Sequence, residues 1–190
     1  MDMDLDKLFP RHLSNDFKTL QGVLPLAKHP PNIRSRYAFI GTEKITVECR
    51  IYNEWPASVV DLPDMGSRML HALYTKHHDG RTRQRCLESI LNYDDEWIPP
   101  FVFWLLGEYV IEIVNVINER KESLAHKKSY QVFVKSNPDY LNFIENRCAS
   151  YWDCYYRHKY KAKKEYPGIV CLNYLRDIKL PPMLQSCDIL

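Results

Sequence analysis

The segment from Trp97 to Ile117 is so rich in apolar side chains that it cannot stand alone in water, and this property constrains the fold more than any other feature. It begins Trp-Ile-Pro-Pro-Phe-Val-Phe-Trp-Leu-Leu, and Glu108 is its first charged residue. Such a helix has to bury its apolar side chains against other elements. Glu108 and Glu112 also make the stretch too short and too charged to cross a membrane. We therefore expect a helix packed in a helical body, with no transmembrane segment.

The residues before this segment complete a helical hairpin from Asp79 to Glu119. A first helix is followed by an acidic turn over residues 92–96 and by a second helix that starts near Trp97. The first helix carries Asp79, Arg83, Cys86, Leu87, Ile90 and Leu91 in that order. This pattern resembles a single HEAT-type helical repeat unit, which is about 40 residues long. The resemblance implies a scaffold that binds another molecule, and it names no ligand.

Residues 37–52 have the pattern of a β-hairpin that follows an irregular N-terminal arm. Apolar residues at 45, 47, 49 and 51 alternate with polar ones, which predicts a strand exposed to water on one side. Tyr37 to Ile40 should pair with it through a loop from Gly41 to Lys44. A lone hairpin is only marginally stable in water, so we expect it to pack on the helices.

A second strong helical pattern begins at Pro138. Apolar side chains recur at spacings of three and four residues, which predicts a core-facing helix that continues to Lys164. Its stripe consists of Leu141, Ile144, Cys148, Tyr151 and Tyr155. The predicted fold is mainly α, with HEAT-like antiparallel helical hairpins and a small N-terminal β-hairpin. We expect one domain over residues 1–190, with an irregular arm and hairpin at 1–60 and a helical body at 64–190.

The composition favours a reducing compartment. Six cysteines are spread along the chain without the close paired spacing of a zinc site, so free thiols are expected. The first residues are acidic where an export signal would be basic and then apolar. We expect a cytoplasmic protein. The last four residues, Cys-Asp-Ile-Leu, formally fit a prenylation pattern, although Asp188 is a poor match for an aliphatic position.

The sequence contains no motif that indicates catalysis. It has no Gly-x-Ser-x-Gly turn, no phosphate-binding loop and no His-Glu-x-x-His motif. Glu108 and Glu112 have no histidine three residues later, which di-iron helices require. His77 and His78 are adjacent and would point apart on a helix. We therefore predict neither a cofactor nor a metal site, and the sequence leaves an enzymatic activity without support.

One face of the predicted helix from 96 to 121 is a candidate partner-binding seam. At roughly 100° per residue, aromatic residues and acids share this face, and aliphatic residues occupy the rest. The seam consists of Trp97, Phe101, Trp104, Glu108 and Glu112. Like charges four residues apart repel unless a cation lies between them, which a basic protein partner or a second copy could supply. The alternative is that the glutamates are solvated or pair with this chain's own cations, while the tryptophans pack internally.

A second candidate site lies in the segment from Tyr155 to Tyr166. Its positive charge is concentrated in a chain whose formal net charge is only +2. The candidate residues are Arg157, Lys159, Tyr160, Lys161, Lys163 and Lys164. Aromatic rings beside cations are typical of sites for single-stranded nucleic acid, because the bases stack on the rings and the phosphates pair with the cations. The alternative is that the cations stabilise the end of a helix.

These patterns lead to one principal functional hypothesis. The sequence predicts a non-enzymatic intracellular protein that binds a protein partner, as an adaptor, a regulator or an immunity-type protein does. The alternative is a single-stranded nucleic-acid-binding protein that uses the basic, tyrosine-rich segment at 155–166.

Overall fold

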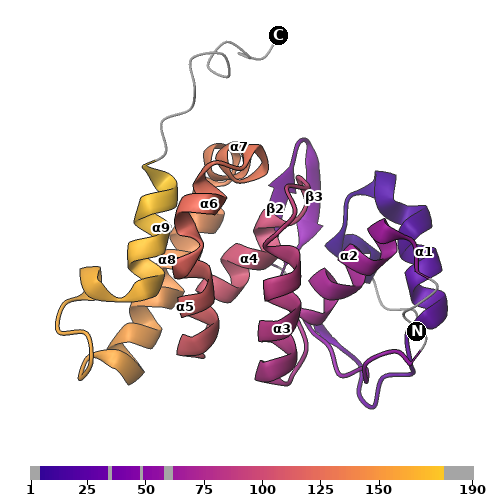
Figure 1. The fold of residues 1–190 in the computed structure, drawn as a ribbon, viewed down its shortest axis with the longest axis horizontal. Helices are drawn as coiled ribbons and strands as arrows, with labels where there is room; N and C mark the ends of the chain where they lie inside the picture. Colours follow the sequence, from indigo (N-terminus) through magenta and orange to yellow (C-terminus); the bar gives the residue numbers. More distant parts are fainter. Residues whose placement is uncertain (1–4, 34–35, 48, 58–61, 178–190) are drawn as a thin grey trace, which may run out of the picture.

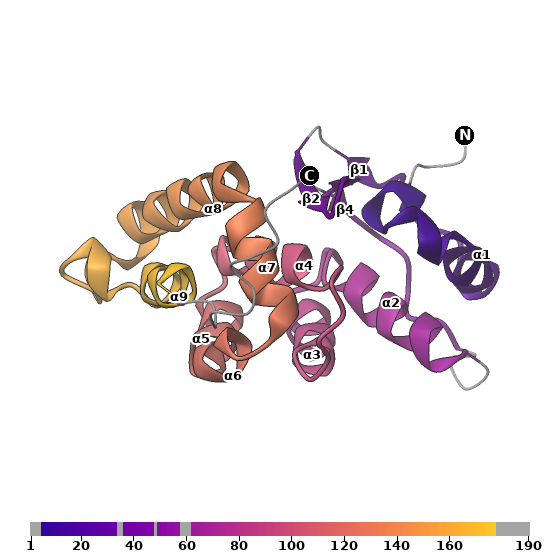
Figure 2. The ribbon, with the colours of Figure 1, turned by 90° about the horizontal axis from the view of Figure 1, so that it is seen from above.

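Residues 5–33, 36–47, 49–57 and 62–177 are described by the computed structural model, and the helices follow one another along its long axis (Figure 1). α1 (Ser14–Val23) lies near one end, and α8 (Pro138–Tyr151) and α9 (Pro167–Arg176) lie at the other (Figure 2). Between them come α2 (Asp64–Tyr74), α3 (Gly80–Ile90), α4 (Pro99–Leu106), α5 (Ile111–Glu119), α6 (Lys121–Ala125) and α7 (Lys128–Ser136). The mainly α-helical class is confirmed. No helix in these ranges is long and apolar enough to span a bilayer.

The predicted β-hairpin is present, with a shorter loop than expected. β2 (Tyr37–Ile40) pairs antiparallel with β3 (Glu43–Thr46), and Ile40 faces Glu43 across the turn. Only Gly41 and Thr42 remain in the loop. Gly41 has φ of +57°, whereas Thr42 has no positive φ. This is the pattern of a type II′ turn, which requires glycine at its first central position and matches the twist of the strands.

The chain after β3 does not continue as the single strand that the sequence predicted. Ile45, Val47 and Ile51 are buried as expected, but β3 ends at Thr46. β4 (Cys49–Arg50) then pairs antiparallel with β1 (Asn32–Ile33). Ile51 next pairs with the loop that follows α2: its N–H donates to the Lys76 carbonyl at 3.0 Å, and its carbonyl accepts from His78 N–H at 3.1 Å. These bonds fasten the β-segment to the helical body.

The hairpin that resembles a HEAT unit begins as predicted and then departs from a simple two-helix form. The side chain of Asp79 accepts a hydrogen bond from Thr82 N–H at 2.8 Å and caps the start of α3. The predicted single helix from 96 to 121 is broken into α4 and α5, which residues 107–110 separate. Gly107 ends α4, and the Arg147 side chain packs against it: its Nε donates to the Gly107 carbonyl at 2.8 Å. The HEAT-like assignment itself remains a prediction.

The predicted stripe of the helix at 138 is buried over its first three positions. Leu141, Ile144 and Cys148 are buried, and α8 packs against α4 and α9. The helix ends at Tyr151, however, and a π-helical turn follows at Trp152–Tyr156. Tyr151 is half-buried and Tyr155 is exposed. The prediction of one continuous helix to Lys164 is therefore wrong.

Candidate functional site

The predicted seam of Trp97, Phe101, Trp104, Glu108 and Glu112 is not a surface. The three aromatic side chains and Glu108 are buried, and Glu112 is exposed. The wheel calculation assumed one straight helix, whereas the chain breaks between Glu108 and Glu112. Moreover, every residue of α4 is buried, as expected for a helix that is apolar on all sides. The prediction of a partner-binding seam on this helix is therefore wrong.

The N-terminal arm covers the aromatic residues of the predicted seam. The ring of Phe9 lies 5.4 Å from the ring of Trp97, edge-on, and 5.4 Å from the ring of Phe101, stacked. The ring of Trp104 lies 6.2 Å from Phe143, and the Arg147 guanidinium lies over it at 4.5 Å. These aromatic side chains thus form part of the core, and the chain's own residues occupy the place assigned to a partner.

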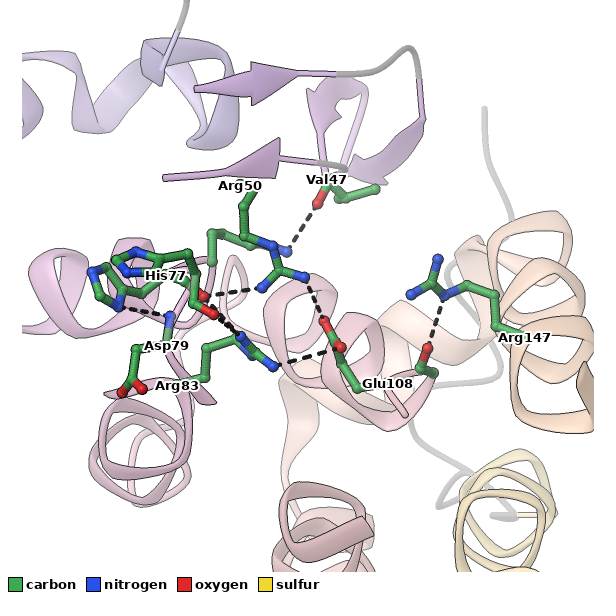
Figure 3. A network of polar contacts seen from close by, with 10 residues as sticks. Val47, Arg50, His77, Asp79, Arg83, Glu108 and Arg147 are labelled. Atoms are coloured by element: carbon green, nitrogen blue, oxygen red, sulfur yellow. Dashed lines mark hydrogen bonds and ion pairs between the residues drawn. The ribbon is translucent and has the colours of Figure 1, made fainter. Parts of the chain in front are cut away.

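Glu108 lies in a buried network of charges (Figure 3). Its carboxylate accepts a hydrogen bond from Arg50 Nη2 at 3.2 Å, and Arg83 Nη2 lies 3.8 Å away. Both guanidinium groups also donate to the His77 carbonyl, at 3.0 Å from Arg50 and 2.9 Å from Arg83. The cation that the sequence analysis sought for Glu108 therefore comes from this chain. The network joins β4, the α2–α3 loop and the end of α4.

Two further groups extend this network without making it a reactive centre. The buried Lys76 ammonium donates to the Val47 carbonyl at 2.9 Å and lies 5.0 Å from the rings of Phe101 and Trp104. His77 Nδ1 accepts from Asp79 N–H at 3.1 Å, which requires that nitrogen to be unprotonated. Burial, aided by the neighbouring His78, lowers the pKa of His77. The arrangement therefore favours a neutral imidazole and a structural role.

The buried thiols are equally unsuited to chemistry. Burial raises the pKa of Cys86, Cys148 and Cys171 to about 12 in each case. A thiol acts as a nucleophile or metal ligand only as the thiolate, so these three are inert near neutral pH. Nor do three or more His, Cys, Asp or Glu side chains gather in a metal-binding cluster anywhere in the described ranges.

A concave site lies between the β2–β3 hairpin and α7. We call it the hairpin–α7 hollow; its volume is about 300 Å³. It is lined by Phe39, Ile40, Gly41, Asp94, Glu96, Lys128, Ser129, Val132, Phe133 and Ser136. Phe39 and Val132 are each 46% exposed, although both are large and apolar. Phe39 also lines a second hollow of about 280 Å³ towards α8. The hollow therefore offers apolar surface that this chain leaves uncovered.

Reciprocal capping fixes the wall of the hollow opposite the hairpin. The Lys127 ammonium donates to the carbonyls of Leu91 and Tyr93, at 2.6 and 2.5 Å, beyond the end of α3. In return, the Asp94 carboxylate accepts from the N–H groups of Lys128 and Ser129, at 3.2 and 3.0 Å, at the start of α7. Both charges match the local helix dipoles. The α3–α4 loop and α7 are therefore held in a fixed relation.

Asn137 fixes the hairpin wall in a similar way. Its side-chain oxygen accepts from Phe39 N–H at 2.7 Å, and its amide nitrogen donates to the Phe39 carbonyl at 2.9 Å. One side chain thus satisfies both backbone groups of a strand residue, as a neighbouring strand would. Asn137 itself is buried. The hollow is consequently held open by hydrogen bonds on both sides, which is the preorganisation that binding requires.

The predicted cationic residues lie on the surface. Arg157, Lys159, Lys161, Lys163 and Lys164 are exposed, and Tyr160 is half-buried against Tyr166. Two of the cations are paired: Arg157 lies 3.0 Å from Asp153, and Lys163 lies 3.6 Å from Glu145. Arg157 follows directly after the π-helical turn Trp152–Tyr156, and Lys163 and Lys164 begin a short 3-10 helix, Lys163–Glu165, so the cations do not continue α8. The structure thus brings this set together on an exposed loop.

Sequence comparison adds no functional information. No family model, curated protein or solved structure matches this chain. The sequence analysis missed Phe39 and Val132, although one signal was available. Tyr37 and Phe39 alternate with Ala38 and Ile40, so one pair of large side chains had to lie on the exposed face of the hairpin. The candidate sites therefore rest on geometry.

Proposed function

We propose that this protein is a non-catalytic binding protein whose hairpin–α7 hollow receives an apolar side chain from an extended segment of another protein. The observation that carries the proposal is the exposure of Phe39 and Val132 beside a hollow that is already formed. Apolar side chains left uncovered at a concave, rigid site are typical of interaction surfaces. A volume of about 300 Å³ is small for enclosing a substrate but sufficient for a large side chain.

The polar lining of the hollow favours binding over chemistry. It includes no histidine or cysteine, so the hydroxyls of Ser129 and Ser136 have no imidazole base beside them in the lining. The Asp94 carboxylate is occupied by the backbone of α7. Glu96 makes no hydrogen bond or ion pair to any residue that the structure describes, and it is exposed. A partner segment with Lys or Arg close to its apolar residue would complement this carboxylate.

Free thiols support the same assignment to the cytoplasm that we expected from the sequence. Cys86, Cys148 and Cys171 are buried without disulfide bonds. Proteins of oxidising compartments usually form such bonds, whereas those of reducing compartments do not. We therefore propose that the partner is a cytoplasmic protein.

A peptide library tests the proposal directly. A display library of random peptides is selected against the full chain, and the enriched peptide is measured by fluorescence anisotropy. We expect a large apolar residue next to Lys or Arg. Val132→Asp should weaken binding by at least about tenfold, because the apolar side chain loses its burial. Glu96→Lys should weaken it as well. Leu26→Asp is the matched control, since Leu26 is 95% exposed and lies outside the hollow.

Two results would contradict this function. One is that the chain and its Val132→Asp variant enrich the same peptides equally, which would show that the hollow is not the peptide-binding site. The other is a concentration-dependent dimer in analytical ultracentrifugation that Val132→Asp abolishes. In that case a second copy of this chain, and no foreign protein, would occupy the hollow.

A further inference from the structure

Three tyrosines from two separate parts of the chain form a row beside the cationic loop. Tyr109 lies between α4 and α5, and its ring is 6.1 Å from that of Tyr151 at the end of α8. The ring of Tyr155 lies 6.2 Å beyond Tyr151, in a stacked arrangement. Tyr109 is 52% exposed and Tyr155 is 58% exposed. This tyrosine row therefore presents its two outer rings to solvent.

The tyrosine row is held in place by contacts around it. The Tyr156 hydroxyl donates to the Tyr109 carbonyl at 2.6 Å and ties the α4–α5 loop to the turn after α8. The Arg147 guanidinium lies over the Tyr151 ring at 5.6 Å. Ordered aromatic rings lose little conformational freedom when a ligand stacks on them. These contacts fix the backbone at Tyr109 and the ring of Tyr151, on either side of which the outer tyrosines pack.

The cationic loop, Arg157 to Lys164, follows the tyrosine row in the sequence. Lys159, Lys161 and Lys164 are exposed, and none of the three has an ion-pair partner within the described part of the chain. The indole of Trp152 donates to the Tyr160 carbonyl at 2.8 Å and closes the loop back on the end of α8. Three exposed lysines therefore lie in the loop that follows Tyr155 in the sequence, and no ion pair neutralises them within the described residues.

We propose that the tyrosine row and the cationic loop bind single-stranded nucleic acid, with bases stacked on Tyr109 and Tyr155 and phosphates on the lysines. Single strands expose the faces of their bases to aromatic side chains, whereas a duplex keeps them stacked internally. An acidic peptide would use the cations and leave the rings without a role. The observations thus favour a single strand. This site is separate from the hairpin–α7 hollow and does not depend on the protein-binding proposal.

Fluorescence anisotropy with labelled oligo(dT) and oligo(rU) of 15 nucleotides tests the site. We expect binding at low salt that weakens with a logarithmic slope near -0.7 per phosphate contacted. Tyr109→Ala and Tyr155→Ala should each weaken binding by about 5- to 150-fold, whereas Tyr155→Phe should retain it. Tyr174→Ala is the control, because Tyr174 is exposed on α9 outside the row.

Charge variants distinguish a specific role of the loop lysines from a general effect of the protein's net charge. Replacing Lys159, Lys161 and Lys164 with Ala should flatten the salt slope by about two units. Replacing Lys18, Lys28 and Lys135 with Ala removes the same charge from other exposed positions and should leave the slope unchanged.

Three outcomes would overturn the proposal. The first is no anisotropy change with either oligonucleotide at low salt. The second is equal affinity for a 15-base-pair duplex or for heparin, which would show a general polyanion surface. The third is full binding by both tyrosine-to-alanine variants. Val132→Asp should leave oligonucleotide binding intact, so failure here is distinguishable from failure of the hairpin–α7 site.

Discussion

Glu108 and Arg83 face each other across 3.8 Å, and both side chains are almost completely enclosed by the protein. Breaking a buried ion pair from one side leaves an uncompensated charge in a medium that solvates it poorly. The Arg83 guanidinium would then retain only the carbonyls of His77 and His78, each at 2.9 Å. The pair thus couples the start of α3 to the end of α4.

We predict that Glu108→Gln lowers the free energy of unfolding by roughly 3 to 5 kcal/mol. Glu112→Gln makes the same chemical change four residues later on the exposed surface. It should change the free energy of unfolding by less than about 0.5 kcal/mol. Urea denaturation followed by circular dichroism measures both values. Equal effects of the two substitutions would contradict the burial of Glu108.

Gly168 lies at a tight contact between α9 and α8. A β-carbon there would lie 2.9 Å from a ring carbon of Tyr166 and 3.0 Å from Cys148 Sγ. Gly168→Ala should therefore destabilise the protein by about 1 to 3 kcal/mol through overpacking. Gly22→Ala on α1 meets nothing within 4 Å and should be neutral or stabilising by up to about 1 kcal/mol. If Gly168→Ala is as stable as the parent protein in thermal melts, the tight packing of α9 at this position is contradicted.

Asn137 should control the position of the hairpin. Replacing it with Ala removes both hydrogen bonds to the Phe39 backbone and the bond from its amide to the Phe133 carbonyl. We expect a loss of about 1 to 3 kcal/mol and faster hydrogen exchange at the Phe39 amide. Asn92→Ala is the comparison, because Asn92 makes only a 3.5 Å bond on the surface. Unchanged exchange at Phe39 would show that the hairpin is held by other contacts.

The pH dependence of stability should reflect His77. Its pKa in the folded protein is lowered from the ordinary value of 6.5, so the unfolded chain binds the proton more readily. The contribution of His77 to the free energy of unfolding is complete above a pH of about 6.5. It is lost as the pH falls towards the pKa of the folded state. We expect His77→Asn, which keeps an acceptor for Asp79 N–H, to reduce the loss measured by urea melts between pH 7.5 and 5. His158→Asn is the control, because it alters an exposed ring. If His77→Asn leaves the pH dependence of stability unchanged, another group causes the loss.

Local patterns predicted several elements of the fold. Alternation at 45–51 is a property of neighbouring residues, and together with the loop predicted before it this pattern located the β2–β3 hairpin. The stripe from Leu141 to Cys148 likewise depends on helical spacing alone, and its burial is confirmed. Asp79 also caps α3, at the position where the sequence analysis began its first helix. These features follow from the sequence because each involves residues close along the chain.

The predictions that failed depend on contacts between residues that are far apart in the sequence. The break at Gly107 is supported by Arg147, which lies forty residues further along the chain. Trp97 and Phe101 are covered by Phe9, which no helical wheel includes. Because the predicted helix was unbroken, the sequence analysis did not single out Tyr109, which lies exposed in the break between α4 and α5. The cations at 157–164 are exposed as expected, because lysines are seldom buried, but the helix that was predicted to carry them ends before they begin.

The contact between Phe9 and the aromatic side chains of α4 also bears on how the protein is made. Phe9 and Phe101 are separated by 92 positions in the sequence. At a synthesis rate of about 5 to 20 residues per second, the N-terminal arm waits roughly 5 to 20 seconds for its binding site to be translated. The arm leaves the ribosome first and can close over α4 once that helix has emerged. Removal of the arm would leave Trp97 and Phe101 uncovered in every newly made chain and expose it to aggregation.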